Sequence, residues 1–279
     1  MLRGVLREAL DTLTSLILPA PCRICESLLL EASRIPVCSG CLLRIRPLAG
    51  PSCQCCGRPY FSPVAAVSAQ PLCQLCRRTT YAFDHARSFA AYDDHLARAI
   101  ILLKYHAVTS LAGWFASHLA DRIAAEPAVF PADTVLPVPL DAARRRERGF
   151  NQAELLARPL AKKLGLPLQS SWLLRTRPRP EKLRLSRRER WTTVRGAYEV
   201  RENAPVDNLR LLLVDDVFTT GATLDACARA LKRAGAAAVT GITVGRLLPA
   251  WWSAAAPDNN PGRGGIPSSA GQSSGDASR

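Results

Sequence analysis

Two adjacent aspartates, Asp215 and Asp216, end the most apolar run of the chain and are followed at once by a Thr- and Gly-rich turn. The run LRLLLVDDV (209–217) is typical of a strand that is buried on both faces of a parallel sheet. Ligands of such sheets bind beyond the carboxyl ends of the strands, where these two carboxylates would lie. The pair is therefore placed to accept hydrogen bonds from sugar hydroxyls or to hold Mg²⁺.

The turn after the aspartates has the residue types that hold a phosphate. Gly221 allows positive φ and a close approach of the backbone to an oxyanion. The helix that follows directs its unpaired N–H groups at the same point. An acid pair at a strand end can also be a helix cap, but the unbroken order of strand, acids, loop and helix favours a ribose-phosphate site. The residues expected to hold the phosphate are Thr219, Thr220, Gly221, Ala222 and Thr223.

Two nucleotide-binding patterns are missing from the chain. The P-loop pattern GxxxxGK[ST] does not occur, and no GxGxxG follows an expected strand. The sequence therefore indicates neither a P-loop NTPase nor a dinucleotide site.

Nine of the ten cysteines lie between Cys22 and Cys76, and most of them form Cys-x₂-Cys pairs. Each pair aims two thiolates at one metal, and two pairs complete a tetrahedral Zn²⁺ site that has no open position for catalysis. We pair sequence neighbours, although an interleaved pairing has the same spacing. Two structural zinc ions are then expected, one on Cys22, Cys25, Cys38 and Cys41, the other on Cys53, Cys56, Cys73 and Cys76. Cys55 is left over, and Cys227 is expected to be a small buried residue.

Two segments concentrate positive charge. RRRERGFNQ (144–152) opens a helix, and its Arg144, Arg145 and Arg148 could meet a pyrophosphate or the phosphates of DNA. RTRPRPEKLRLSRRER (175–190) carries eight Lys/Arg against two Glu. It has little periodicity, so it is expected to be a mobile basic loop over the sheet, with a plain solvated loop as the alternative.

The remaining pattern is an alternation of strands and helices. This alternation predicts a parallel α/β sheet. We expect strands over 86–92, 133–140, 209–217 and 237–247 and helices over 94–105, 110–125, 150–164 and 222–234. The whole chain then divides into an amphipathic helix (1–20), a cysteine-rich module (21–80), the α/β region (81–248) and a disordered tail (249–279).

Composition and charge indicate the kind of partner and the cellular location of the protein. The net charge of +14 over 279 residues points either to an anionic partner or to a solvated basic surface. No stretch reaches the ~20 apolar residues of a membrane span. The apolar segment 12–21 follows Glu8 and Asp11, whereas a secretory signal would carry positive charge there. We expect a cytoplasmic protein, in which the cysteines bind metal and do not form disulfides.

The segment 211–223 resembles the phosphoribosyl-diphosphate binding motif of type I phosphoribosyltransferases, in which an apolar strand, two acids and a Thr/Gly loop follow one another. The resemblance implies that Asp215 and Asp216 contact the ribose hydroxyls, directly or through Mg²⁺. It also implies that residues 219–223 hold the 5′-phosphate of phosphoribosyl diphosphate.

Residues 15–248 together resemble the ComF (ComFC/GntX-like) family, in which a double zinc ribbon precedes a phosphoribosyltransferase-like domain. Besides the cysteine pairs, the matching motifs are LKY (103–105), VPL (138–140), RGFNQ (148–152), RGA (195–197) and VDDVFTTGAT (214–223). Glu181 and Thr193 depart from the family's usual Gln and Asn. The resemblance implies a role in natural competence, with single-stranded DNA and competence-machinery proteins as partners. It implies a cytoplasmic place, with the inner face of the membrane as an alternative.

Three functions follow from these motifs. The first is a Mg²⁺-dependent phosphoribosyltransferase, with Asp215, Asp216 and Lys104 as catalytic candidates and Lys104 and the arginines at 144–148 neutralising the departing pyrophosphate. The second is a single-stranded DNA-binding protein, although the basic segments carry few aromatics for base stacking, Trp191 being the exception. The third is an adaptor that senses a phosphorylated ligand. No segment names the acceptor base.

Overall fold

The computed structural model describes residues 20–29, 33–60, 72–178, 186–249 and 252. The helix expected over 1–20 lies outside them apart from Ala20, as does most of the tail expected over 249–279. The cysteine-rich region and the α/β region both belong to one compact unit that ends at Leu248. Within the described ranges, no helix combines the length and the apolar character needed to cross a membrane.

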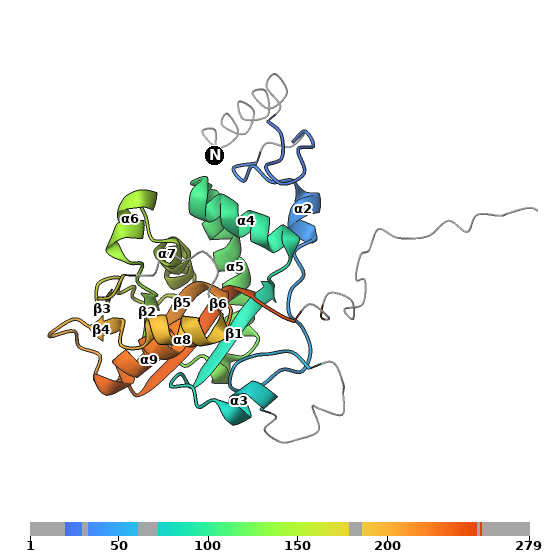
Figure 1. Cartoon of the computed structure of the whole chain (residues 1–279). Coiled ribbons are helices and arrows are strands. Elements are labelled where there is room, and N and C mark those ends of the chain that lie inside the picture. The colour runs from blue at the N-terminus through green and yellow to red at the C-terminus, as the bar shows by residue number, and fades with distance from the viewer. Residues whose placement is uncertain (1–19, 30–32, 61–71, 179–185, 250–251, 253–279) are drawn as a thin grey trace, which may run out of the picture. The chain divides into compact units, whose positions relative to one another are not determined.

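The centre of the unit is a sheet of parallel strands in the order β1-β6-β5-β2 (Figure 1). Each of the strands expected from the sequence is found, with ends that differ by a few residues. They are β1 (His85–Ala91), β2 (Thr134–Pro137), β5 (Arg210–Phe218) and β6 (Ala238–Arg246). The predicted fold class, a parallel α/β sheet, is confirmed.

Helices cover both faces of this sheet. α5 (Ser110–Ala124) and α7 (Gln152–Leu164) pack on one face, and α9 (Ala222–Arg233) packs on the other. Side chains of β5 alternate between the two layers: Leu212 and Val214 belong to the first core cluster, and Leu211 and Leu213 belong to the second. This double burial explains the continuous apolar run in the sequence.

Two helices begin just after the carboxyl ends of sheet strands, the first after β1 and the second after β2. α4 (Asp94–Tyr105) begins after the N-cap Asp93, and α6 (Ala142–Arg148) begins after the N-cap Asp141. Gly149 ends α6 with a positive φ of 77°. The chain then turns directly into α7, whose N-cap is Asn151. The RGFNQ motif thus forms the short connection between α6 and α7.

The segment 175–190 is more ordered at its end than the sequence predicts. β3 (Leu173–Arg175) pairs antiparallel with β4 (Tyr198–Val200), and helix α8 (Arg187–Val194) lies between them in sequence. A capping box explains the helix, because the Ser186 side chain accepts from Glu189 N and the Glu189 carboxylate accepts from Ser186 N. α8 has no clear apolar stripe, so periodicity did not indicate it. Residues 179–185 lie outside the described part.

The cysteine-rich region covers the edge of the sheet that β1 forms. It contains the short helices α2 (Ser39–Leu43) and α3 (Gln74–Arg78). Leu48 N donates to Phe89 O at 2.8 Å, and Ala86 N donates to Cys55 O at 2.7 Å. These bonds occupy backbone groups of β1 that would otherwise be exposed at the edge.

Candidate functional site

The aspartate pair lies where β5 runs past its neighbour. β2 ends at Pro137, which pairs with Val214, whereas the pairing of β5 with β6 continues to Phe218. Asp215 and Asp216 therefore stand at the carboxyl end of the sheet, as expected for a ligand site. Asp215 is partly exposed and Asp216 is buried.

A cavity of about 770 Å³ opens at this point. It has the size of a small-molecule site. Its wall includes most of the residues singled out from the sequence: Lys104, Arg144, Arg148, Asp215, Asp216, Thr219, Thr220, Ala222 and Thr223. These residues come from three separate segments of the chain, α4, α6 and the stretch from the end of β5 into α9, and they converge on one space.

Two of the predicted residues stand apart from the cavity wall. Arg145 points to a different partner, because its guanidinium lies 3.7 Å from the carboxylate of Glu154. Gly221 contributes through its backbone: it has φ +79° and is the N-cap of α9. A Cβ at this position would lie 2.7 Å from Phe218 Cζ and 2.9 Å from Tyr81 Cε1. The positive φ expected for Gly221 is therefore found, together with tight packing that only glycine fits.

Lys104 and Asp216 form an ion pair inside the cavity, with 2.5 Å between Nζ and Oδ2. Their side chains are 19% and 9% exposed, so the pair is screened by little water. Lys104 comes from the last turn of α4. The pair fixes an ammonium group beside the carboxylates at the end of β5.

Arg148 is held by two neighbours that also line the cavity. It donates to Tyr105 Oη at 2.9 Å and to Gln152 Oε1 at 3.1 Å, and its guanidinium carbon lies 4.6 Å from the centre of the Tyr105 ring. Contact with an aromatic face and an amide aims the cation without neutralising it. Arg148 therefore keeps its full charge for an anionic ligand.

Sequence reasoning left several wall residues without an assigned role. Arg175 donates to Tyr198 Oη at 2.8 Å, and burial raises the pKa of the Tyr198 phenol well above its usual value. The phenol is thus a neutral group that can donate its proton to a ligand oxygen. The additional residues on the wall include Tyr92, Tyr105, Arg175, Arg190, Thr193 and Tyr198. Tyr105 belongs to the LKY motif and Tyr198 directly follows the RGA motif, and these positions were the available signal.

The segment that joins the cysteine-rich region to β1 supports the loop at 219–223. Tyr81 Oη donates to Thr220 O at 3.1 Å, and the Tyr81 ring stacks on Phe83 with centroids 4.6 Å apart. Phe83 in turn meets Phe218 edge-on at 6.2 Å. The loop is therefore braced by residues distant in sequence.

The cysteines form two tetrads, each made of sequence neighbours: Cys22, Cys25, Cys38 and Cys41, and Cys53, Cys56, Cys73 and Cys76. Within each tetrad the sulfur atoms all lie within 4.8 Å of one another. The distances Cys25–Cys38 and Cys56–Cys73 are 3.6 and 3.7 Å. Thiolates bound at ~2.3 Å to a tetrahedral Zn²⁺ lie about 3.8 Å apart, so both tetrads fit zinc.

Backbone N–H groups point at the sulfur atoms of both tetrads. Cys38 N donates to Cys22 Sγ at 3.3 Å, and Cys73 N donates to Cys53 Sγ at 3.3 Å. Such bonds stabilise thiolates and orient them for a metal. The two tetrads therefore share the same backbone contact, as is typical of structural zinc sites.

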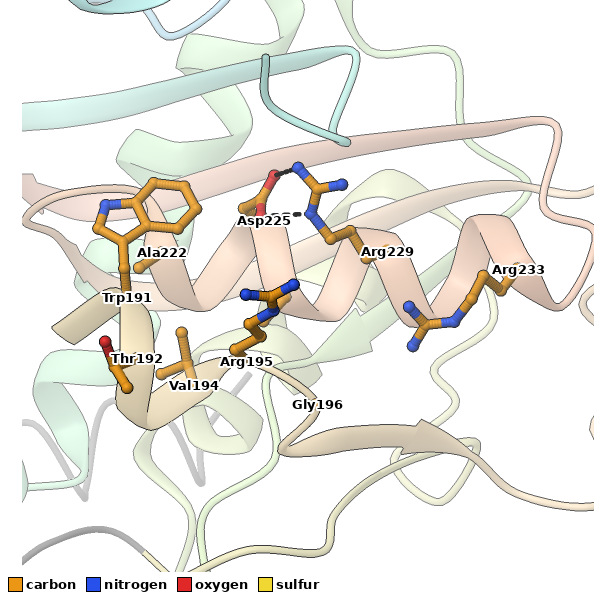
Figure 2. A pocket seen from close by; sticks show the side chains of 10 residues that line it. Trp191, Thr192, Val194, Arg195, Gly196, Ala222, Asp225, Arg229 and Arg233 are labelled. Atoms are coloured by element: carbon orange, nitrogen blue, oxygen red, sulfur yellow. Dashed lines mark hydrogen bonds and ion pairs between the residues drawn. The ribbon is translucent and has the colours of Figure 1, made fainter. Parts of the chain in front are cut away.

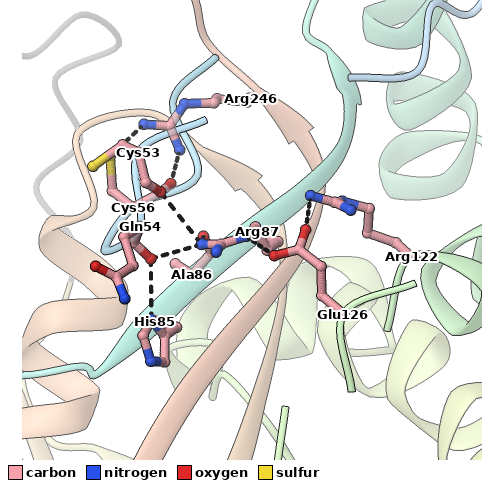
Figure 3. Close-up of polar contacts among 9 residues, drawn as sticks. All are labelled: Cys53, Gln54, Cys56, His85, Ala86, Arg87, Arg122, Glu126 and Arg246. Carbon is pink, nitrogen blue, oxygen red and sulfur yellow. Dashed lines mark hydrogen bonds and ion pairs between the residues drawn. The ribbon is translucent and has the colours of Figure 1, made fainter. Parts of the chain in front are cut away.

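Two buried arginines tie the second tetrad to the sheet (Figure 3). Arg246 donates to Cys56 O at 2.5 Å and to Cys56 Sγ at 3.2 Å. Arg87 donates to Gln54 O at 3.0 Å and to Glu126 Oε2 at 2.9 Å. Both arginines are 4% exposed. No carboxylate of the described residues pairs with Arg246, so thiolate charge on the tetrad is its compensation.

Comparisons with known proteins agree with these features. The DNA utilization protein YhgH of Salmonella typhi is 31% identical over 227 residues, which are 80% of this chain and 96% of that protein. The competence protein ComFC of Bacillus subtilis is 28% identical over 210 residues, or 72% of this chain and 80% of that protein. No family model matches the chain.

Among solved structures, the glutamine phosphoribosylpyrophosphate amidotransferase of B. subtilis aligns with 48% of this chain and 26% of its own. The identity is 24% and the TM-score 0.34. Because this TM-score is low, the parallel α/β fold class is assigned from the topology of the sheet and not from this similarity. The similarity to YhgH covers nearly that whole protein, and the chain therefore belongs to the ComF family of competence and DNA utilization proteins.

Proposed function

We propose that the 770 Å³ cavity binds phosphoribosyl diphosphate with Mg²⁺ and that the protein is a phosphoribosyltransferase. The observation that carries the proposal is the division of charge within one cavity. Carboxylates of Asp215 and Asp216 lie on one strand end, and the cations Lys104, Arg144 and Arg148 surround them. A sugar bearing phosphates on two sides needs this arrangement of hydroxyl acceptors between anion-binding groups.

The residues have distinct roles in this proposal. Asp215 and Asp216 accept hydrogen bonds from the 2- and 3-hydroxyls of the ribose. The turn at 219–223 and the N-terminus of α9 hold the 5′-phosphate. Mg²⁺, when bound, would neutralise pyrophosphate oxygens and would be held by the two carboxylates.

Transfer breaks the bond between C1′ and pyrophosphate, and positive charge develops on the ribose ring. Pyrophosphate leaves with the electron pair of that bond. Lys104, Arg144 and Arg148 stabilise the negative charge that it gains. An acceptor then bonds to C1′ and loses a proton. The wall opposite the loop, which includes Tyr198, is where that acceptor would enter.

Isothermal titration with phosphoribosyl diphosphate, with and without Mg²⁺, tests the proposal. We expect Mg²⁺-dependent heat in the wild type and an affinity roughly 10–100-fold lower for Asp215→Asn and for Asp216→Asn, because each loses charge-assisted contacts. Asp94→Asn is the control, since this aspartate is 68% exposed and pairs with Arg98 on α4. Wild-type heat in all three variants, or none in the wild type, would refute the site.

A role in DNA utilization or competence is proposed from the family, with cytoplasmic single-stranded DNA as the partner. The net charge of +14 supports contact with a polyanion. Gel-shift titration of a single-stranded oligonucleotide should then show an affinity that falls steeply between low and moderate salt. An affinity independent of salt contradicts this role and leaves the phosphoribosyl proposal intact.

A further inference from the structure

A second cavity, of about 570 Å³, lies on the other side of helix α8 from the first. Val194 and Ala222 line both cavities, so they form a shared wall. The second cavity plays no part in the proposed phosphoribosyl chemistry, because neither aspartate of the pair borders it. Its wall belongs to α8, to the turn after α8 and to one face of α9 (Figure 2).

Positive charge dominates this wall. Asp225, Arg229 and Arg233 follow one another at a spacing of four residues, so they share one face of α9. The Arg229 guanidinium is neutralised by Asp225, which lies 2.8 Å away and is 3% exposed. Arg195 and Arg233 have no hydrogen bond or ion pair from their side chains among the residues that the structure describes. Two unpaired guanidinium groups therefore face the cavity.

An aromatic ring lies at one end of the same space. Figure 2 shows the Trp191 indole beside Ala222, Arg195 at the end of α8, and Arg233 at the far end of α9. The indole meets Tyr81 on one side, with ring centroids 5.8 Å apart. The side chains of Val194 and Ala226 add an apolar floor. A flat, apolar ring system on the ligand would fit this end of the cavity.

We propose that this second cavity binds a nucleotide, with its base against Trp191 and its phosphate between Arg195 and Arg233. Indole stacking suits any base because each base has a π-face, and guanidinium groups bind phosphate with paired hydrogen bonds. A smaller anion would leave the apolar end unused. The nucleotide is either free or one unit of a single strand, which share this chemistry.

Fluorescence anisotropy of a labelled 12-nucleotide oligothymidylate on the full chain tests the proposal. We expect Trp191→Ala to weaken binding by roughly 5–100-fold and Arg233→Ala by roughly tenfold. Arg158→Ala is the control: it removes another exposed arginine, on α7, whose pair is Glu154, and it should change affinity by about twofold or less. Arg233 lies at the exposed end of a helix, so its variant should fold even if Trp191→Ala does not.

Competition identifies the source of the nucleotide. Displacement of the probe by thymidine monophosphate supports a site for free nucleotides, and displacement only by unlabelled oligothymidylate supports a site for a strand. Inorganic phosphate displacing the probe as well as the mononucleotide would overturn the proposal, as would wild-type affinity in both variants. Titration with phosphoribosyl diphosphate and Mg²⁺ should be unchanged in both variants, so failure here is separable from failure of the first site.

Discussion

Arg246 joins the second cysteine tetrad to the phosphate loop through two contacts of one guanidinium. It donates to Cys56 Sγ at 3.2 Å, and its central carbon lies 4.3 Å from the centre of the Phe218 ring. Phe218 is the register partner of Arg246 in the sheet and directly precedes the loop. A Cys₄ zinc site carries a net charge of about −2, which offsets the buried guanidinium. The tetrad and the loop are therefore packed as one unit.

The first prediction follows from the charge of Arg246. Arg246→Met keeps an unbranched apolar stem but removes the donors to Cys56, so the second tetrad should bind zinc about 10–100-fold more weakly. Competition with a chromogenic chelator and native mass spectrometry should show one zinc leaving early and the other retained. Arg77→Met replaces an exposed arginine whose side chain donates to Leu72 O, and this variant should release zinc like the wild type. Equal release from all three proteins would contradict the contact's role.

Gly221 supplies the second prediction. In Gly221→Ala the methyl group would meet Phe218 and Tyr81 at a backbone φ of +79°. We expect a loss of about 1–3 kcal/mol in the free energy of unfolding and a phosphoribosyl diphosphate affinity at least roughly tenfold lower, because the loop shifts. Thermal unfolding and calorimetry measure the two effects.

Gly113→Ala is the matched control for this substitution. Gly113 lies inside α5 with nothing within 4 Å of its would-be Cβ, so alanine should raise stability by about 0.5–1 kcal/mol and leave ligand affinity unchanged. If Gly221→Ala behaves like Gly113→Ala, the loop does not need its left-handed glycine.

The sheet and its acids were predictable because their signals are local. A continuous apolar run followed by Asp215 and Asp216 needs no distant partner to be recognised, and the residue type alone predicts the end of helix α7 at Gly165. The cysteine pairs were equally local. Their grouping into neighbour tetrads was left open by the spacing and is settled by three-dimensional proximity.

Contacts made across the fold were not predictable in the same way. Arg246 ends a strand and looks like an ordinary basic residue, yet it lies against Cys56, 190 positions away. Tyr81 reaches Thr220 across a similar separation. Helix α8 was missed for another reason, since its stability rests on a capping box and on α9, not on an apolar stripe of its own. One sequence does not encode such pairings in any short motif.

The third prediction concerns the ion pair of Lys104 and Asp216. Lys104→Met leaves the buried carboxylate unpaired, and the free energy of unfolding should fall by about 1–3 kcal/mol without ligand. The double variant Lys104→Met, Asp216→Asn should recover part of that loss, because the carboxylate that Lys104→Met leaves without its ammonium partner is then removed. Denaturant unfolding of both single variants and the double variant measures the coupling. Strictly additive effects would show that the pair contributes nothing.

A matched control separates burial from charge removal. Arg98→Met removes the same kind of charge on α4, but its ion pair with Asp94 is exposed. Its effect should stay within about 1 kcal/mol. A loss as large as that of Lys104→Met would mean that the helix α4, and not the cavity, is the source of the effect.

The fourth prediction is a pH dependence that arises at His118. Its ring stacks on Phe89 at 4.5 Å and meets Trp114 edge-on at 4.3 Å. Burial lowers the pKa of His118, and the nearby Asp121 acts in the opposite direction to a smaller extent. The folded protein therefore binds this proton more weakly than the unfolded chain. The contribution to stability is complete above the unfolded pKa of about 6.5 and is lost as pH falls below it.

Replacing the titrating ring isolates this effect. His118→Phe keeps the stacking against Phe89 but cannot be protonated, so its Tm relative to the wild type should be constant above pH 7 and should rise progressively from pH 6.5 to 5. Thermal unfolding of both proteins at fixed zinc concentration measures the difference, and protonation of the cysteine thiolates affects the two proteins equally. Curves that stay parallel over this range would show that the stacked ring carries its proton as easily in the folded state as in the unfolded chain.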